Sequence, residues 1–277
     1  MSRIKSKNLS SKLSKELSEN LVDICLLTCS MVKPEIFRKC IDAIKSEMES
    51  IPSRLIVFQN GPIVNKYNYP ELPPLSRMTS SAQRLGFPAG ANRVIRSGHA
   101  PLVLFITDDI ILKPGCLDAL VRRMDDKTVG ICGLKLLFPL DSNESGPAGT
   151  VQHVGHGINI RGQITHPFLG WSADNPKCCV SREVVSVTGG CFMVRRGAFE
   201  NTGGFFEGYG TGYFEDVDLC FMIKKLWGRV FIDTDAQAFH YVGQSMKQVE
   251  RPPMQFNEMI LHTRWPGAFT WSEFEML

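Results

Sequence analysis

The stretch that decides the fold is residues 101–109, which read PLVLFITDD. Its apolar run predicts a strand that is buried on both faces, as the strands of parallel sheets are. Asp108 and Asp109 follow directly, at the strand end where ligands collect in open α/β sheets. Two adjacent carboxylates repel each other unless a cation neutralises them, and hard divalent cations prefer such oxygen ligands. The alternative is a solvated turn, in which Asp is also common.

Upstream of this strand, strand and helix patterns alternate. Residues 21–28 (LVDICLLT) and 54–60 (RLIVFQN) are short apolar runs with the character of buried strands. Between them, residues 34–48 place apolar side chains on one side and begin with Pro34, which a first helical turn tolerates. Strand, helix and strand in this order predict the start of a parallel, doubly wound sheet.

Downstream, the alternation continues after one long interruption. Residues 139–182 lack periodicity and are rich in Gly, Pro, His and Asn. A loop of that length inside a compact domain indicates a functional excursion. The remaining expected elements are a helix at 115–124, strands at 129–138 and 184–196, a helix at 215–227 and a strand at 229–233, with His240 beyond it.

The composition is that of an ordinary globular protein. Apolar residues make up 43% of the 277 residues and charged ones 21%, which excludes a disordered, collagen-like or coiled-coil chain. A net charge of +3 predicts no nucleic-acid binding. We find neither an apolar run of the roughly 20 residues that a membrane helix needs nor a secretory signal. The nine irregularly spaced cysteines are interpreted as reduced thiols, so we expect a cytoplasmic protein, with peripheral membrane contact left open.

We expect three parts along the chain. Residues 1–20 form a polar N-terminal extension, 21–245 the folded domain, and 246–277 a C-terminal extension packed on or near the functional site. In the first part, Leu9, Leu13, Leu17 and Leu21 recur every four residues, as in a helix with one narrow apolar stripe. Such a helix would dock on a membrane or a partner, or simply lead into the domain.

A second acidic cluster lies in the segment GYFEDVDLC, which holds Glu215, Asp216 and Asp218. Carboxylates in a first helical turn are stabilised by the helix dipole, which alone could explain them. The preceding loop, GGFFEGYGTGY, is rich in Gly and aromatic residues and suits a lid or a surface that stacks against sugars. An acid at the edge of such a loop could act as a general base.

The histidines give a weaker signal. His240 follows a predicted strand and is either a structural residue or a metal ligand. His153 and His156 have a spacing that suits a metal on a helix. The glycines around them in QHVGHGINI argue against a helix, and so against a metal site built by that pair.

Several segments, in this order, resemble glycosyltransferase family 2, whose members are inverting enzymes with the GT-A fold. The resemblance runs from about Val22 to Val242. It is carried by the strand ending in Thr28, Asn60-Gly61, LGFPAGANR, ITDD, VTGGCFMVRR followed by GGF, EDVDLC and the final histidine. It implies an α/β, Rossmann-like, doubly wound and mostly parallel sheet with helices on both faces, in a single domain.

The resemblance also implies roles for individual residues. Asp216 matches the catalytic base, and Asp109 with His240 matches the site of a Mn²⁺ or Mg²⁺ ion. The nucleotide-sugar side would consist of Thr28, Asn60, Arg84, Gly86, Gly90, Asn92, Thr107 and Asp108. The acceptor side would include Gly190 and Glu215, and we add Trp171 of the 139–182 loop because aromatic faces suit sugars.

The chain departs from the family pattern at three points. Thr107 stands where many members have the first acid of the metal motif, and Arg84 where many have Asn. The processive members carry Gln-x-x-Arg-Trp, whereas residues 261–265 read LHTRW. Together with the lack of membrane helices, this predicts the addition of one or a few sugars.

The function implied is metal-dependent transfer of a sugar from a UDP-, dTDP- or GDP-linked donor to a hydroxyl of a glycan or another acceptor. A dinucleotide-dependent oxidoreductase would need GxGxxG after the first strand, where the chain reads TCSMVKPE. The other alternative is a catalytically inactive relative that binds a glycan or a partner protein. Oligomeric state cannot be read from the sequence.

Overall fold

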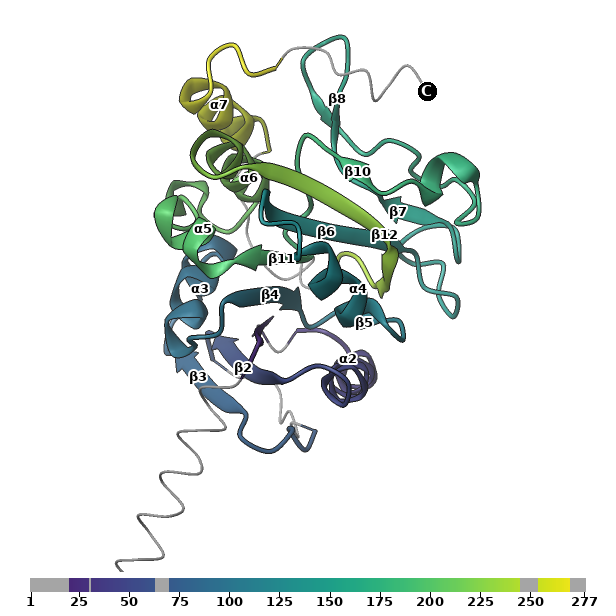
Figure 1. The fold of residues 1–277 in the computed structure, drawn as a ribbon, viewed down its shortest axis with the longest axis vertical. Coiled ribbons are helices and arrows are strands. Elements are labelled where there is room, and N and C mark those ends of the chain that lie inside the picture. Colours follow the sequence, from purple (N-terminus) through teal and green to yellow (C-terminus); the bar gives the residue numbers. More distant parts are fainter. Residues whose placement is uncertain (1–19, 30, 63–69, 245–253, 270–277) are drawn as a thin grey trace, which may run out of the picture.

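A large mixed sheet forms the centre of the molecule in a computed structural model, which describes residues 20–29, 31–62, 70–244 and 254–269 (Figure 1). The strands are β1 (Val22–Thr28), β2 (Ser53–Asn60), β3 (Arg77–Ser81), β4 (Leu102–Thr107), β5 (Ile110–Leu112), β6 (Val129–Leu137), β7 (Val151–His153), β8 (Gly157–Ile158), β9 (Ile164–Thr165), β10 (Arg182–Glu183), β11 (Cys191–Arg195) and β12 (Arg229–His240). The α-helices are α2 (Pro34–Met48), α3 (Phe87–Val94), α4 (Cys116–Arg123), α5 (Arg196–Asn201), α6 (Glu215–Leu226) and α7 (Met254–Arg264), and the short 3₁₀ helices are η1 (Ile95–Ser97), η2 (Pro176–Cys179) and η3 (Glu207–Tyr209).

The central strands are apolar at successive positions because helices cover both faces of the sheet. In β1, Ile24 and Leu26 pack into one core cluster, whereas Cys25 and Leu27 pack into another on the opposite face. This is the alternation that a pleated strand imposes on successive side chains. The first cluster includes residues of α2 and α4, and the second includes residues of α3, α5 and α6 (Figure 1). The result is a sheet between two layers of helices, as the sequence predicts.

The order of the strands brings the carboxyl ends of several parallel strands to the same side of the sheet. The main path is β10-β12-β6-β11-β4-β1-β2-β3. β4, β1, β2 and β3 are parallel neighbours, and β11 runs antiparallel between β4 and β6. The chain goes from β1 to β2 on one side and later enters β4 on the other. The gap between β1 and β4 is therefore a topological switch point, the place where open α/β sheets bind ligands.

Two segments differ from the sequence expectation. The strand expected at 229–233 continues as β12 to His240, so this histidine ends the strand rather than following it. A register shift between Asp233 and Gln237 interrupts the pairing with β6, and the polar residues there hide the continuation in the sequence. The stretch 139–182 contains β7, β8, β9 and η2, and Val151, Val154 and Cys178 bury a small apolar cluster under it.

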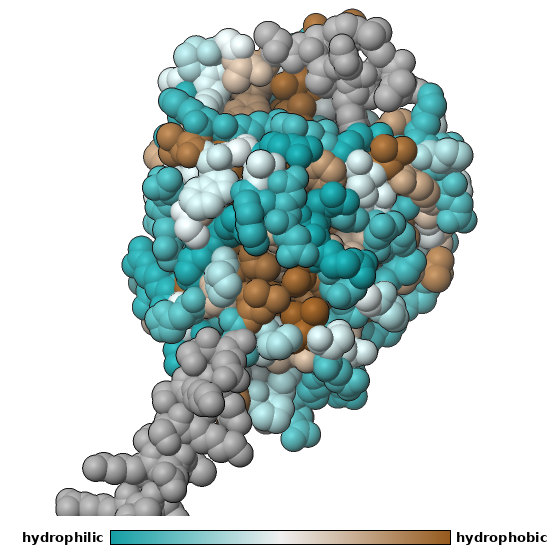
Figure 2. Space-filling view, in the orientation of Figure 1, coloured by the Kyte–Doolittle hydropathy of each residue, from teal (hydrophilic) through white to brown (hydrophobic). Residues whose placement is uncertain are grey.

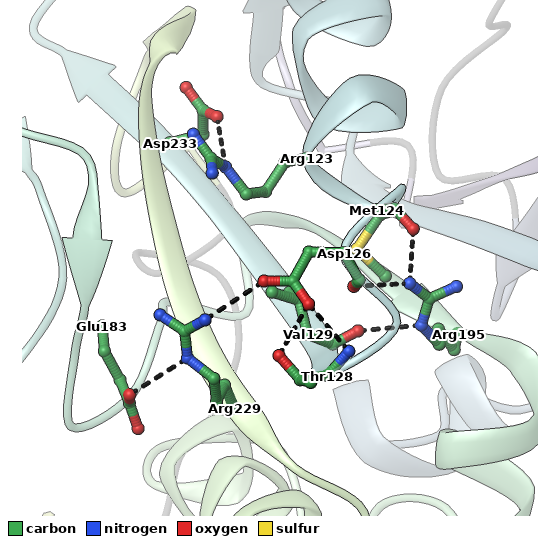
Figure 3. A network of polar contacts seen from close by, with 9 residues as sticks. All are labelled: Arg123, Met124, Asp126, Thr128, Val129, Glu183, Arg195, Arg229 and Asp233. Atoms are coloured by element: carbon green, nitrogen blue, oxygen red, sulfur yellow. Dashed lines mark hydrogen bonds and ion pairs between the residues drawn. The ribbon is translucent and has the colours of Figure 1, made fainter.

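A polar network connects the residues at the amino ends of β6 and β12 (Figure 3). Arg229, the first residue of β12, pairs with Asp126 at 3.1 Å and with Glu183 at 3.2 Å. Arg195 donates from Nε to the carbonyl of Val129, the first residue of β6, at 2.9 Å. The Arg229 pairs are exposed to solvent, so each contributes little to stability. Their role is to fix the amino ends of β6 and β12 beside one another.

The surface and the chain ends add two observations. Most of the face in Figure 2 is hydrophilic, with hydrophobic side chains gathered in smaller groups. None of the helices in the described part of the chain has the length and apolar character to span a bilayer. Leu9, Leu13 and Leu17 of the expected N-terminal stripe lie outside the described residues.

Candidate functional site

A pocket with a volume of ≈ 550 Å³ opens at the switch point, within the size range of small-molecule sites. It extends along the sheet edge from the ends of β1 and β2 to the start of α6. Its lining includes Thr28, Asn60 and Arg84 near the ends of β1 and β2, Thr107, Asp108, Asp109, Gly190 and His240 around the end of β4, and Glu215 and Asp216 at the start of α6. Residues that lie far apart in the sequence thus share one cavity.

The two acids after β4 have different surroundings. Burial, together with the charge of Asp109, raises the pKa of Asp108 to about 7, although a hydrogen bond with Thr28 acts in the other direction. Burial also raises the pKa of Asp109, but attraction to His240 and hydrogen bonds outweigh it and hold this pKa below its usual range. One of these bonds comes from Thr107, whose Oγ1 donates to Asp109 Oδ1 at 2.7 Å. Thr107, which stands where many family members have an acid, therefore orients Asp109.

Strand pairing brings His240 to these acids. β12 pairs with β5 so that His240 faces Ile110, and the backbone N–H of Tyr241 donates to the carbonyl of Asp109 at 3.0 Å. His240 Nδ1 lies 3.2 Å from the side-chain oxygen of Gln152, which can only accept a hydrogen bond. Nδ1 therefore donates a proton to Gln152, and Nε2 is the ring nitrogen that faces Asp109 and the pocket. Such a second contact is typical of metal-binding histidines.

The residues in the middle of the pocket fit a divalent cation. Nε2 of His240 lies 3.6 Å from Oδ2 of Asp109, too far for a hydrogen bond. Two atoms that bind the same ion at about 2.1 Å each are separated from one another by a distance similar to this 3.6 Å. Oδ2 of Asp108 is buried and has no hydrogen-bond partner among the described residues. An uncompensated carboxylate oxygen at this place is what a bound cation would neutralise.

At the other end of the pocket, Asp216 is held by the backbone. Its Oδ2 accepts the N–H of Gly189 at 2.7 Å, and its Oδ1 accepts the N–H of Val217 at 2.8 Å. Burial raises the pKa of Asp216, and these two amides partly oppose the shift. Tyr213 and Phe214, which precede the helix, have φ values of 80° and 69°, uncommon for residues other than Gly. This tight turn delivers the first residues of α6 to the pocket wall.

The other two acids of α6 have separate positions. Glu215 also lines the pocket and is buried. Asp218 lies away from the pocket lining and holds α7, because it accepts hydrogen bonds from Arg264 at 3.0 Å and from the indole of Trp265. The arginine and tryptophan of the family-like LHTRW segment therefore serve to dock α7 onto α6.

Asn60 and Arg84 shape the end of the pocket near β2. The side chain of Asn60 exchanges two hydrogen bonds with the backbone of Leu85, at 2.8 Å and 2.7 Å. This fixes the segment that carries Arg84. The Arg84 Nε is buried without a hydrogen-bond partner among the described residues, so it can serve an anionic ligand.

Four residues of the expected set lie outside the pocket lining. Asn92 contacts the following loop instead, because it bonds the backbone N–H and carbonyl of Phe205 at 2.9 Å each. Gly86 lets α3 approach the loop closely, since an added Cβ would lie 1.6 Å from the carbonyl oxygen of Gly210. Gly90 allows α3 to pack on Leu27 and Phe58 of the sheet. The fourth is Trp171, which packs edge-on against Phe168 and is 42% exposed.

Helix α7 covers the loop that borders the pocket. Met254 lines the pocket, and buried Asn257 donates from Nδ2 to the carbonyls of Tyr209 at 2.9 Å and Gly212 at 2.7 Å.

We expect Asn257→Ala to lower the free energy of unfolding by about 1–3 kcal/mol, because buried carbonyls lose their donor. Urea denaturation measures this change. Thr263→Ala on the exposed side of α7 is the control, and an equal effect of both variants would contradict the role of Asn257.

Sequence reasoning missed several residues of the site. Gln152 orients His240, the backbone of Gly189 holds Asp216, and His156 and His166 line the pocket. The pair His153 and His156 gave a signal, but His166 lies ten residues further on, and only the fold unites the three. Gln152 has no local signal, and the segment VTGGCFMVRR that holds Gly189 does not show that its backbone contacts Asp216, because both contacts depend on how distant segments pack.

Comparisons with solved structures define the class of the fold. GalNAc-T7, determined with UDP, GalNAc and Mn²⁺, is similar with a TM-score of 0.66 over 90% of this chain and 50% of that chain, at 11% identity. A mannosyltransferase, PcManGT from Pyrobaculum calidifontis in complex with GDP-Man and Mn²⁺, gives a TM-score of 0.55 over 90% of this chain and 72% of that chain, at 14% identity. The predicted GT-A fold, a mostly parallel sheet with helices on both faces in one domain, is confirmed.

Among curated proteins, a stretch of the chain is similar to the O-antigen biosynthesis protein RfbC of Myxococcus xanthus. The two are 30% identical over 169 residues, which is 58% of this chain and 12% of that protein. The chain therefore matches only a small part of this relative. No protein-family model matches the chain.

Proposed function

We propose that the protein is a metal-dependent, inverting glycosyltransferase that moves a sugar from a nucleoside-diphosphate sugar to a hydroxyl of a glycan or another acceptor. The observation that carries the proposal is the shared pocket of Asp109, His240 and Asp216. The pocket thus combines a place for a divalent cation with a carboxylate base. The two similar solved structures, which hold Mn²⁺ with UDP or GDP-Man, support the same reading.

Asp109 and His240 would hold the Mn²⁺ or Mg²⁺ ion. A cation bound there offsets negative charge that develops on a nucleoside-diphosphate leaving group. Arg84 would contact the diphosphate from the other side. Thr28, Asn60 and Asp108, at the ends of β1, β2 and β4, would position the nucleoside, as the switch point of an α/β sheet does. We assign Thr107 to the support of Asp109 rather than to the donor.

Asp216 would accept the proton of the attacking hydroxyl. The amides of Gly189 and Val217 hold its two oxygens in a fixed direction, so the base is oriented before the acceptor arrives. Its raised pKa moves it toward the range in which a carboxylate accepts a proton effectively. A single displacement by a hydroxyl on the face opposite the leaving group would invert the anomeric centre. Glu215 and Gly190 would border the acceptor.

The alternative is a GT-A-like protein that binds a glycan or a partner without turnover. The intact set of Asp109, His240 and Asp216 in one pocket favours the enzyme. We infer a non-processive reaction, because Arg264 and Trp265 of the LHTRW segment engage Asp218 instead of lining the pocket.

A thermal-shift screen tests the proposal. UDP-, dTDP- and GDP-sugars are added with Mn²⁺, with Mg²⁺ and with EDTA, and the true donor should raise the melting temperature only with a metal. Release of nucleoside diphosphate from that donor then separates an enzyme from an inactive binding protein. A set of nucleotide sugars none of which stabilises the protein with either metal would contradict the proposal.

A further inference from the structure

Three histidines from two neighbouring segments of the 139–182 stretch come together at the pocket that holds the proposed base. His153 ends β7, His156 follows it, and His166 follows β9. Each offers one ring nitrogen, and these three atoms lie within 4.8 Å of one another. The ring centroids are 4.6–5.2 Å apart in edge-to-face pairs. His156 and His166 also line the pocket.

The hydrogen bonds of His153 fix where its proton lies. The backbone N–H of Thr188 donates to Nε2 of His153 at 3.2 Å, so this nitrogen carries a lone pair. Burial lowers the pKa of His153 well below its usual range, so the ring is neutral and its only proton is on Nδ1. That proton points to the Nδ1 of His166, 3.1 Å away.

The proton position of His166 follows from that contact. Its Nδ1 accepts a hydrogen bond from Nδ1–H of His153, and burial lowers the pKa of the His166 ring to about 3, so this ring is also neutral. The remaining proton is therefore on Nε2. His166 can thus donate a hydrogen bond from Nε2 but cannot accept one there.

This arrangement opposes a metal ion held by the three rings. His153 could bind a metal only through Nδ1, which would move its proton to Nε2. There it would face the N–H of Thr188, and two donors would point at each other. A metal-binding histidine normally donates its second N–H to an acceptor such as a carbonyl or carboxylate. The cluster therefore has the chemistry of a hydrogen-bonded chain.

One backbone segment fixes both the hydrogen-bonded histidines and the proposed base. Thr188 donates to His153, and the next residue, Gly189, donates to Asp216 at 2.7 Å. Asp216 and His166 line one pocket, and the charge of Asp216 partly opposes the burial that lowers the pKa of His166. A hydroxyl that gives its proton to Asp216 has two lone pairs on its oxygen: one forms the bond to the sugar, and the other can accept a hydrogen bond.

We propose that His166, held in its Nε2–H form by His153, donates a hydrogen bond to the oxygen of the attacking hydroxyl while Asp216 accepts the proton of that hydroxyl. This inference rests on the proposed function, because it assigns a partner to the same acceptor. His153 acts as a positioning residue. His166 would contact the substrate, and neither ring changes its charge in the reaction.

The ring protons can be measured without turnover. Long-range ¹H–¹⁵N spectra of the ¹⁵N-histidine-labelled protein at pH 7 distinguish the two neutral forms, and His156→Gln and His166→Gln variants assign the signals. We expect His153 as the Nδ1–H form and His166 as the Nε2–H form. The opposite form of either ring would overturn the proposal. So would a shift of the signals of all three rings together when an equimolar amount of Zn²⁺ is added.

Turnover tests the contact with the substrate. The reaction is hydrolysis of the nucleotide sugar that gives the largest Mn²⁺-dependent thermal shift, with water as the simplest hydroxyl. His166→Phe keeps a ring but removes the donor, and turnover should fall by roughly 3- to 10-fold, as expected for one hydrogen bond. His166→Gln keeps an N–H and should recover most of the loss. The thermal shift with UDP or GDP and Mn²⁺ should stay unchanged in both variants.

Each result has a separate meaning. If His166→Phe turns over like the parent, or if Gln does not rescue, His166 does not contact the attacking oxygen. A loss of the nucleotide-dependent shift in His166→Phe would indicate a structural role instead. If the parent hydrolyses no donor, the proposed function fails and the substrate contact fails with it, whereas the spectra still decide the proton positions of the histidine pair.

Discussion

Asp216→Asn should lower turnover by about 10²-fold or more while donor affinity barely changes. The amide has nearly the same shape but cannot accept a proton at neutral pH. In the proposed function the nucleotide and the cation bind near Asp108 and Asp109, which line the same pocket as Asp216. A fall in kcat with an unchanged KM for the donor would mark a loss confined to the transition state. Steady-state kinetics with the donor found in the screen provide the measurement.

The structure adds a stability effect to this prediction. Both oxygens of Asp216 accept a backbone N–H, and the NH₂ group of Asn can satisfy neither. One amide therefore loses its partner, which costs about 1–3 kcal/mol, and urea denaturation should be run beside the kinetics. If Asp216 merely favours the helix dipole, stability falls by roughly 0.3–1 kcal/mol and turnover stays near normal.

Glu215→Gln is the matched control for Asp216, because it is the neighbouring acid in the same pocket and the charge change is equal. Asp218→Asn is a second control, which should loosen α7 through Arg264 and leave the chemistry in place. If either variant lost far more turnover than Asp216→Asn, the base would be assigned to the wrong carboxylate. The rest of the proposed function could still hold.

Asp109→Ala should abolish the Mn²⁺-dependent stabilisation by nucleoside diphosphate. A ligand at 100 times its dissociation constant stabilises a fold by about 2.7 kcal/mol, and the metal-dependent part of this should vanish. Asp109 lies at a strand end and contributes little packing, so the variant should fold. Thermal shifts with UDP and with GDP, each in Mn²⁺ and in EDTA, measure the effect.

Two variants serve as comparisons for Asp109. His240→Ala should weaken the shift less, because water can replace one neutral ligand. Asp141→Ala changes another carboxylate near the sheet edge, one that pairs with Lys39 at 2.6 Å and does not line the pocket. It should keep the full shift. A full Mn²⁺-dependent shift in Asp109→Ala itself would show that the cation binds elsewhere.

The central layers of the fold were predictable from the sequence because their signals are local. A strand buried on both faces is an uninterrupted apolar run, and β1, β2 and β4 each have one. The order of strands and helices then leaves few topologies. Asp108 and Asp109 could be placed at the sheet edge for the same reason, since they directly follow β4.

The partners of the site residues could not be predicted in this way. Gln152 and His240 are 88 residues apart, and Asp216 is 27 residues from Gly189. No local pattern encodes such contacts, because they arise from strand pairing and from the turn before α6. The same holds for the acids of α6. They look alike in the sequence, yet Asp216 enters the pocket and Asp218 binds α7.

The sequence by itself determined the class of fold, the edge of the sheet that carries the site and the carboxylates available there, because each depends on burial pattern and chain order. Only the tertiary structure decided which groups touch. It directed His240 toward Asp109, joined His166 to His153 and turned Asn92 away from the pocket. The physical reason is that hydrogen bonds act over about 3 Å, so a role made by such a contact exists only once distant segments have packed together.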